Sequence, residues 1–228
     1  MTDDDELGYP AEDFKSIPKD TKIFIIFDPQ DMDSYAARNK TADQLTLAGF
    51  TNIHNHSVAY YGKILDGSYG INLQMGAGHP YDERDARKML LRYYTHTLLL
   101  RKIRTLKKQV IVLEAGVVFR SRIINGKPHY NFIDRKLVDF NFEPLVHKVD
   151  EDGRETHDIS AGYWISPKNA VFLIRYITDT LGGVFNTHLD NVYAELYYNE
   201  VMRQRGKFGF IHDYATIQSK YTAFIRED

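Results

Sequence analysis

Two short apolar runs dominate the hydrophobic pattern of the chain. The first is KIFIIF at residues 22–27, which ends at Asp28-Pro29, and the second is QVIVLEAGVVF at residues 109–119. Both are rich in β-branched and aromatic residues and lack the polar alternation of a half-exposed strand. This pattern is typical of strands that are buried on both faces of a parallel sheet.

Helical periodicity fills the segments between the apolar runs. The sequence predicts helices over 35–48, 81–106, 167–181 and 189–203, and further strands over 50–53 and 159–165. Gly49 ends the first helix, while Ser166 as cap and Pro167 as first residue begin the third. The alternation of strands and helices predicts an α/β fold with a central, mainly parallel sheet flanked by helices.

The length and the hydrophobic content indicate one domain. The chain has 228 residues, of which 43% are hydrophobic, enough for a single sizeable core. Residues 1–20 are acidic and contain Pro10 and Pro18, so we expect a mobile lead-in before a domain over 21–228. Residues 54–80 are rich in glycine and read as an active-site loop, and Asn125-Gly126 predicts a hairpin turn.

The composition excludes several classes of protein. There is no cysteine, which rules out disulfides and Cys-ligated zinc or iron-sulfur centres. No apolar run is long enough for a transmembrane segment and no signal peptide is visible, so we expect a cytoplasmic protein. The net charge of -2 predicts no attraction of the whole molecule to nucleic acid.

One predicted helix is strongly basic. Nine Lys or Arg residues lie between Arg84 and Lys108, against the single acid Asp85. Such a helix is a candidate for contact with a diphosphate or another polyanion. The alternative is a solvated charged face, because cations near a helix end are favoured by the helix dipole in any case.

Four segments follow one another in a distinctive order between residues 21 and 200. They are the strand KIFIIFD with the helix that carries Arg38, the triplet Tyr94-Thr95-His96, the strand VIVLEAGVVF, and Ser160-Ala-Gly-Tyr-Trp-Ile-Ser166 followed by His188-Leu189-Asp190. In these segments the chain resembles glycosyltransferase family 25, the lipooligosaccharide-type and collagen-type galactosyltransferase group. The resemblance implies a GT-A-like (Rossmann-like) single domain.

The resemblance also implies an activity. A sugar would be transferred from a nucleotide-diphosphate donor to a hydroxyl of a glycan or glycolipid, with inversion at the anomeric carbon. A UDP-sugar is the donor that we expect first. The residues that it assigns to donor binding are Asp28, Arg38, Arg92, His96, Gly162 and Ser166. It assigns catalysis to Asp190, as the general base, and to Glu114.

The acidic motif of that family is incomplete in this chain. Ala115 and Gly116 stand where the family has aspartates, and only Glu114 remains. Two roles are open for Glu114, which either ligates Mg²⁺ or Mn²⁺ together with Asp190 or binds a donor-sugar hydroxyl. We therefore expect divalent metal to matter less than in relatives with the full motif.

Simpler structural roles stand beside these assignments. Thr187 to Asp190 also fits a capping box at a helix start, Glu114 fits a solvent-facing acid at a strand end, and His96 fits a packed helical histidine. Two other functions are also compatible with the sequence. One is a phage-type transferase that glycosylates hydroxymethylated bases of DNA, and the other is a non-catalytic binding module derived from a transferase.

Overall fold

The computed structural model describes residues 17–119, 121–124, 127–130, 142–144, 148–149, 155–156, 159–198 and 215–217. The first sixteen residues of the expected lead-in, and positions 199–203 of the last predicted helix, lie outside the described residues. Ile17 is 2% exposed and belongs to the core beside Phe50.

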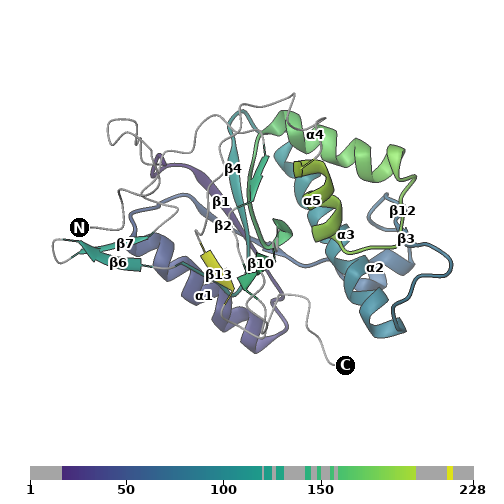
Figure 1. Cartoon of the computed structure of the whole chain (residues 1–228), viewed down its shortest axis with the longest axis horizontal. Coiled ribbons are helices and arrows are strands. Elements are labelled where there is room, and N and C mark those ends of the chain that lie inside the picture. Colours follow the sequence, from purple (N-terminus) through teal and green to yellow (C-terminus); the bar gives the residue numbers. More distant parts are fainter. Residues whose placement is uncertain are drawn as a thin grey trace.

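A five-stranded sheet forms the centre of the molecule (Figure 1). Its strands stand in the order β2 (Ile53–Ser57), β1 (Lys22–Phe27), β4 (Val110–Glu114), β11 (Gly162–Ile165) and β8 (Phe142–Pro144). β1 pairs in parallel with both β2 and β4, whereas β11 is antiparallel to β4 and to β8. The predicted mixed α/β fold with a mainly parallel, helix-flanked sheet is confirmed.

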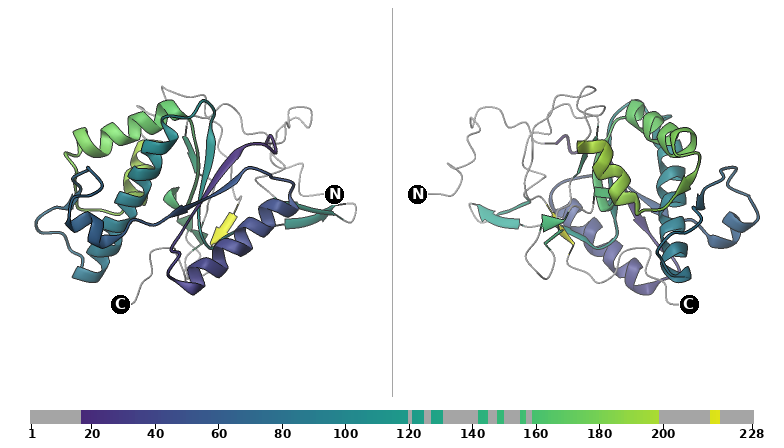
Figure 2. Two further views of the ribbon diagram at one scale, coloured as in Figure 1. Left: turned by 180° about the vertical axis from the view of Figure 1, so that it is seen from behind. Right: turned by 45° about the vertical axis from the view of Figure 1, so that its right-hand side comes forward.

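Both faces of the sheet are covered by helices. Ile23 and Ile25 of β1 share one core cluster with Leu45 of α1 (Met32–Leu47). Phe24 and Ile26 point to the opposite cluster, which also contains residues of α3 (Glu83–Ile103), α4 (Pro167–Arg175) and α5 (Leu189–Tyr198). Figures 1 and 2 show α1 on one side of the sheet and these three helices on the other. Burial on both faces explains the continuous apolar runs of β1 and β4.

Three of the helices, α1, α3 and α4, begin at side-chain caps. Asp31 caps α1 by accepting from the amide of Asp33 at 2.8 Å, which starts this helix three residues before the predicted position 35. Asp82 caps α3 by accepting from the amide of Asp85 at 2.8 Å. Ser166 caps α4 as predicted, with the amide of Asn169 at 3.2 Å. Each cap satisfies an amide that has no partner within its helix.

The segment 54–80 is more ordered than a plain loop. It contains most of β2, the short helix α2 (Tyr61–Leu65) and β3 (Gln74–Met75), which pairs in parallel with β12 (Val184–Phe185). Gly183, at φ 71°, lies so close to the carbonyl of Asn72 that a side chain at this position would collide with it. The second predicted strand, 50–53, is displaced toward residue 57.

The remaining short elements complete the chain. The 3-10 helix η3 (Ile159–Ala161) precedes β11, and the π-helix η4 (Tyr176–Thr180) extends α4 to the predicted stop at Gly182. β6 (Ser121–Ile124) pairs with β7 (Lys127–Tyr130), which confirms the predicted hairpin, although its turn residues are outside the described part. The paired strands β5 (Val117–Phe119) with β13 (Ala215–Ile217), and β9 (Lys148–Val149) with β10 (Glu155–Thr156), lie outside the central sheet.

None of the helices in the part of the chain that the structure describes has the length and hydrophobicity needed to cross a bilayer.

Candidate functional site

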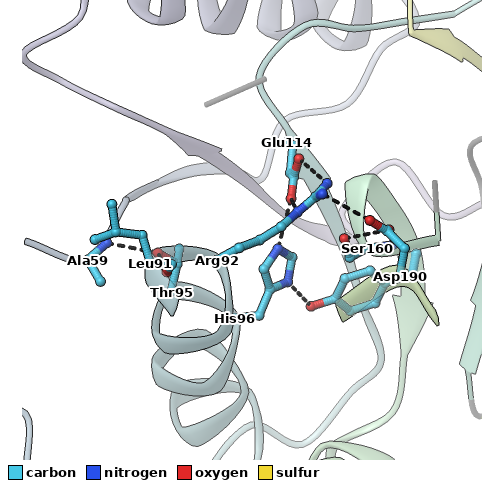
Figure 3. A network of polar contacts seen from close by, with 9 residues as sticks. Ala59, Leu91, Arg92, Thr95, His96, Glu114, Ser160 and Asp190 are labelled. Atoms are coloured by element: carbon cyan, nitrogen blue, oxygen red, sulfur yellow. Dashed lines mark hydrogen bonds and ion pairs between the residues drawn. The ribbon is translucent and has the colours of Figure 1, made fainter. Parts of the chain in front are cut away.

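Arg92 joins two of the predicted site carboxylates (Figure 3). Its Nε and Nη2 donate to Oε1 and Oε2 of Glu114 at 2.9 and 2.8 Å, and its Nη1 donates to Oδ2 of Asp190 at 2.9 Å. The three side chains come from α3, from the carboxyl end of β4 and from the first turn of α5. We call this arrangement, together with His96 and Ser160, the Arg92 network.

The Arg92 network is almost fully enclosed. The side chain of Glu114 is 1% exposed, while those of Arg92 and Asp190 are 14% and 13% exposed. One guanidinium faces two carboxylates, so these three groups carry a net negative charge. A buried ion pair of this kind depends on further hydrogen bonds to offset the cost of removing its charges from water.

Asp190 obtains those further bonds from Ser160. Its Oδ1 accepts from the amide of Ser160 at 2.8 Å and from the Ser160 hydroxyl at 2.7 Å. Burial alone raises the pKa of Asp190, but the Arg92 guanidinium and the two Ser160 bonds outweigh burial and hold this pKa below its ordinary value. The side chain serves the Arg92 network, not the helix backbone as a capping box would require.

His96 connects Glu114 to Tyr163. Its Nε2 lies 3.0 Å from Oε1 of Glu114, and its Nδ1 lies 3.0 Å from the hydroxyl of Tyr163. An ionised carboxylate only accepts, so Nε2 of a neutral imidazole carries the proton and Nδ1 accepts from Tyr163. His96 is 0% exposed, so it orients Glu114 without direct access to solvent.

The Arg92 network does not suit a divalent cation. Mg²⁺ and Mn²⁺ prefer several oxygen ligands, and both oxygens of Glu114 are already bound by Arg92. Positions 115 and 116 supply no side-chain oxygen. Among the residues that the structure describes, no group of three or more His, Asp or Glu side chains is placed to hold a metal.

A cavity of about 730 Å³ opens at the carboxyl ends of β1 and β2. Its lining comprises Asp28, Pro29, Gln30, Ser57, Val58, Ala59, Tyr60, Tyr61, Lys63, Tyr69, Glu83, Arg84, Arg87, Lys88 and Leu91. These residues belong to the loop after β1, to the segment 54–80 and to the first two turns of α3 with Leu91 just beyond. The volume lies within the usual range for a small-molecule site.

The cavity lining is both basic and aromatic. Four basic side chains, Lys63, Arg84, Arg87 and Lys88, face two acidic ones, Asp28 and Glu83. The Arg87 guanidinium stacks 4.2 Å from the ring centre of Tyr61. An excess of cations beside tyrosine rings suits a ligand that has both a polyanionic and an aromatic part.

Internal hydrogen bonds hold the wall of the cavity in place. The amide of Ala59 donates to Oγ1 of Thr95 at 2.8 Å, and this hydroxyl donates to the carbonyl of Leu91 at 2.7 Å (Figure 3). The amide of Asp28 donates to the hydroxyl of Ser34 at 2.9 Å. A wall that is fixed before the ligand arrives reduces the entropy lost on binding.

The cavity and the Arg92 network share one helix. Lys88, which lines the cavity, precedes Arg92 by four positions, and His96 follows after four more. Residues spaced by four lie one above the other on a helix face, about 6 Å apart. Arg92 therefore lies about one helical turn beyond Lys88 and directly follows Leu91, which also lines the cavity.

The structure brings together some of the predicted donor-binding residues and separates others. Asp28 lines the cavity, and Arg92 and His96 belong to the Arg92 network. Arg38 is not part of the cavity lining, since its guanidinium lies 5.2 Å from the ring centre of Phe27 and 4.7 Å from that of Tyr35.

The direction of β11 separates Gly162 from Ser166. Gly162 is buried opposite Leu113, near the end of β4 that carries Glu114. Ser166 follows Ile165, which pairs with Val110 at the amino end of β4. It therefore lies at the opposite end of the strand from Glu114. Because β11 is antiparallel to β4, the cap of α4 points away from the Arg92 network.

Several site residues carry no individual signal in the sequence. The basic helix was singled out as a whole, but the spacing alone did not show that Arg84, Arg87 and Lys88 form its cavity-facing part. Ser160 and Tyr163 lie inside the 160–166 segment, yet their roles depend on contacts with Asp190 and His96, which are 30 and 67 positions away. The tyrosines of the loop carried no distinguishing signal.

Comparisons with known proteins find weak similarity of shape. No family model matches the chain, and no curated protein matches it. Among solved structures, the fold is similar to that of a glycosyltransferase involved in the glycosylation of the major capsid of PBCV-1, with a TM-score of 0.48 and 9% sequence identity. The alignment covers 85% of this chain and 82% of the other.

Proposed function

We propose that the protein is a glycosyltransferase whose donor is a nucleotide-diphosphate sugar, preferably a UDP-sugar, and that this donor binds in the cavity. The observation that carries the proposal is the lining of that cavity, in which Lys63, Arg84, Arg87 and Lys88 surround tyrosine rings at the carboxyl ends of two parallel strands. Ligands of open α/β sheets commonly bind at this edge. The acceptor that we propose is a hydroxyl of a glycan or glycolipid.

The charges of the lining favour a diphosphate donor over a sugar alone. A neutral sugar needs no excess of cations, whereas a departing nucleoside diphosphate gains negative charge that must be stabilised. Arginine and lysine perform this task without a metal, and arginine binds phosphate oxygens in pairs. The proposed transferase therefore relies on its own cations, in keeping with the poor fit of Glu114 and Asp190 to Mg²⁺ or Mn²⁺.

Asp190 is the carboxylate that we propose as general base. It is the more exposed of the two acids in the Arg92 network, at 13% against 1% for Glu114. In an inverting transfer, the acceptor oxygen forms a bond to the anomeric carbon while the bond to the diphosphate breaks, and the electron pair leaves with the diphosphate. The proton of the acceptor hydroxyl passes to the Asp190 carboxylate.

A non-catalytic binding module is a second candidate, favoured by one specific observation. Every oxygen of Glu114 and Asp190 already accepts a hydrogen bond within the Arg92 network. A carboxylate whose pKa is lowered and whose oxygens all accept hydrogen bonds is a weak base. Such a protein would bind the donor in the cavity without turning it over.

Two measurements test the proposal and separate these candidates. Calorimetric titration with UDP-, GDP-, CMP- and dTDP-sugars is expected to show binding of at least one diphosphate donor, and a thermal-shift screen of the same set reports the bound state through its added stability. Release of nucleoside diphosphate on a longer incubation supports the transferase. Binding without release supports the module, and absence of binding to all four donors contradicts both.

A further inference from the structure

We infer that His79, Tyr81 and His188 form a stacking surface for a pyranose ring of the acceptor. This inference rests on the proposed function, and it adds a subsite that the donor cavity does not include. We call these three residues the ring platform.

Two contacts define the ring platform. The rings of Tyr81 and His188 meet edge to face, with centroids 5.1 Å apart and planes at 75°. The rings of His79 and Tyr81 are stacked, with centroids 6.2 Å apart and planes at 23°. The tyrosine therefore contacts two imidazoles, His79 from its own segment and His188 from the residue that precedes α5.

The ring platform differs from the aromatic pairs of the core. Tyr93 with Phe185, and Tyr163 with Tyr193, are buried and fill the interior. His188, in contrast, is exposed, and Tyr81 is half-buried. Solvent-facing rings of this kind are available to a ligand, whereas the core pairs are not.

Several contacts fix the two segments that carry the ring platform. β3 pairs with β12, and Phe185 stacks on Tyr93 with centroids 3.6 Å apart. The hydroxyl of Tyr93 donates to the carbonyl of Thr187 at 3.0 Å, directly beside His188. The position of His188 relative to α3 is therefore set before any ligand binds, which lowers the entropic cost of recognition.

The chain connects the ring platform to both parts of the proposed active site. Tyr81 precedes Glu83 of the donor cavity by two positions, and His188 precedes Asp190 by two positions. An acceptor that stacks on these rings would have its hydroxyls close to the proposed general base. No other half-exposed ring pair among the described residues joins the start of α3 to the start of α5.

The chemistry of the three rings suits a sugar. The face of an aromatic ring is electron-rich and attracts the polarised C–H groups on the apolar face of a pyranose. Imidazole nitrogens supply hydrogen-bond donors and acceptors for hydroxyls at the edge of the sugar.

Saturation-transfer NMR with methyl β-D-galactopyranoside and methyl β-D-glucopyranoside tests the ring platform directly. The full chain is expected to transfer saturation from its aromatic protons to the C–H protons of at least one glycoside. Tyr81→Ala and His188→Ala should each weaken that binding about tenfold, whereas Tyr81→Phe should retain it because the ring remains. Phe172→Ala removes a half-buried ring of α4 from the pair with Tyr176 and is the matched control.

Donor binding, measured by calorimetry on the same samples, separates the two proposals. Lost glycoside binding in Tyr81→Ala with unchanged nucleotide-sugar binding supports the ring platform. Equal saturation transfer in wild type and Tyr81→Ala, or none in the wild type, overturns it even where the donor binds. Glycoside binding that depends on Tyr81 in a protein without donor affinity supports the ring platform and contradicts the proposed function.

Discussion

Arg92 and Asp190 lie 98 positions apart in the sequence, and their side chains meet with Nη1 2.9 Å from Oδ2. Since the same guanidinium also binds both oxygens of Glu114, one side chain connects α3, β4 and α5. Neither carboxylate can change its charge or its position without affecting the other through Arg92. Any variant of these residues therefore alters stability as well as chemistry, and the experiments must measure both.

Asp190→Asn is expected to lower turnover about 10²- to 10⁴-fold, because an amide cannot take the proton of the attacking hydroxyl. The amide oxygen can keep the Ser160 bonds, but its NH₂ group then faces the Arg92 guanidinium, which also only donates. We expect a loss of about 1–3 kcal/mol in the free energy of unfolding. Urea denaturation and steady-state kinetics measure the two effects separately.

Ser160→Ala is the comparison variant for this experiment. It removes one hydrogen bond from Asp190, at a cost of about 1 kcal/mol, and leaves the carboxylate in place. A catalytic Asp190 predicts a much larger loss of turnover for Asp190→Asn than for Ser160→Ala. Similar losses in both variants, each in proportion to the loss of stability, would assign Asp190 a structural role.

Chelation of divalent metal is expected to leave turnover unchanged. Arg92 already binds the two carboxylates that would otherwise hold the ion, and four basic residues line the cavity in which the phosphates would bind. The measurement is product formation in EDTA, with and without added manganese. Complete inactivation by EDTA that manganese reverses would contradict this prediction.

Arg87→Ala is expected to weaken donor binding about tenfold, which corresponds to about 1.4 kcal/mol. The variant removes a charge from the cavity and the stacking partner of Tyr61. The effect should shrink as ionic strength rises, because salt screens a partly exposed charge. Calorimetry at two salt concentrations measures it.

Lys108→Ala is the matched control for Arg87→Ala. Its side chain is 87% exposed and pairs with Asp20 at 3.5 Å, beyond the far end of α3. It removes the same charge from the basic segment without touching the cavity. Equal changes in donor affinity for both variants would show that overall charge, not the cavity, attracts the donor.

Local patterns in the sequence predicted the elements that depend on local physics. The run 22–27 forms β1 with the predicted bounds, and Ser166 and Gly182 delimit a helical segment as expected. Strand pairing is a different matter, because the direction of β11 depends on its partner and not on its own residues. Because of that direction, Ser166 and Glu114 lie at opposite ends of the strands.

The candidate site was likewise only partly predictable from the sequence. The resemblance points to His96, Glu114 and Asp190, and Arg92 precedes His96 by four positions on the basic helix; these four residues do lie together. The cation that pairs with the carboxylates was not predictable, because the basic helix contains nine Lys or Arg residues. Only the packing of α3 on the sheet brings Arg92 to Glu114. The sequence indicated the segment 54–80 and the basic helix separately, but not that they line one cavity, because Tyr60 and Arg87 reach it from different elements.

Stability is expected to fall as the pH drops from about 6.5 to 4, on account of His56. Burial lowers the pKa of His56 to about 4, opposed by a hydrogen bond to the backbone of Thr95 and assisted by the positive charge of Lys102. Nε2 of His56 is buried without a hydrogen-bond partner among the described residues. Protonation of this ring is therefore much more costly in the folded chain than in the unfolded one.

The sign follows from the number of protons bound in each state. Between pH 6.5 and 4 the unfolded chain binds a proton at His56 and the folded chain does not, so the free energy of unfolding falls with falling pH, by up to about 3 kcal/mol. The lowered pKa of Asp190 acts only below its ordinary value of 3.8, which separates the two residues. Urea denaturation at pH 7, 5.5 and 4.5 measures the slope. His56→Gln keeps a polar side chain without a titrating group and should flatten the slope over this window, whereas an unchanged slope would assign the acid sensitivity to other groups.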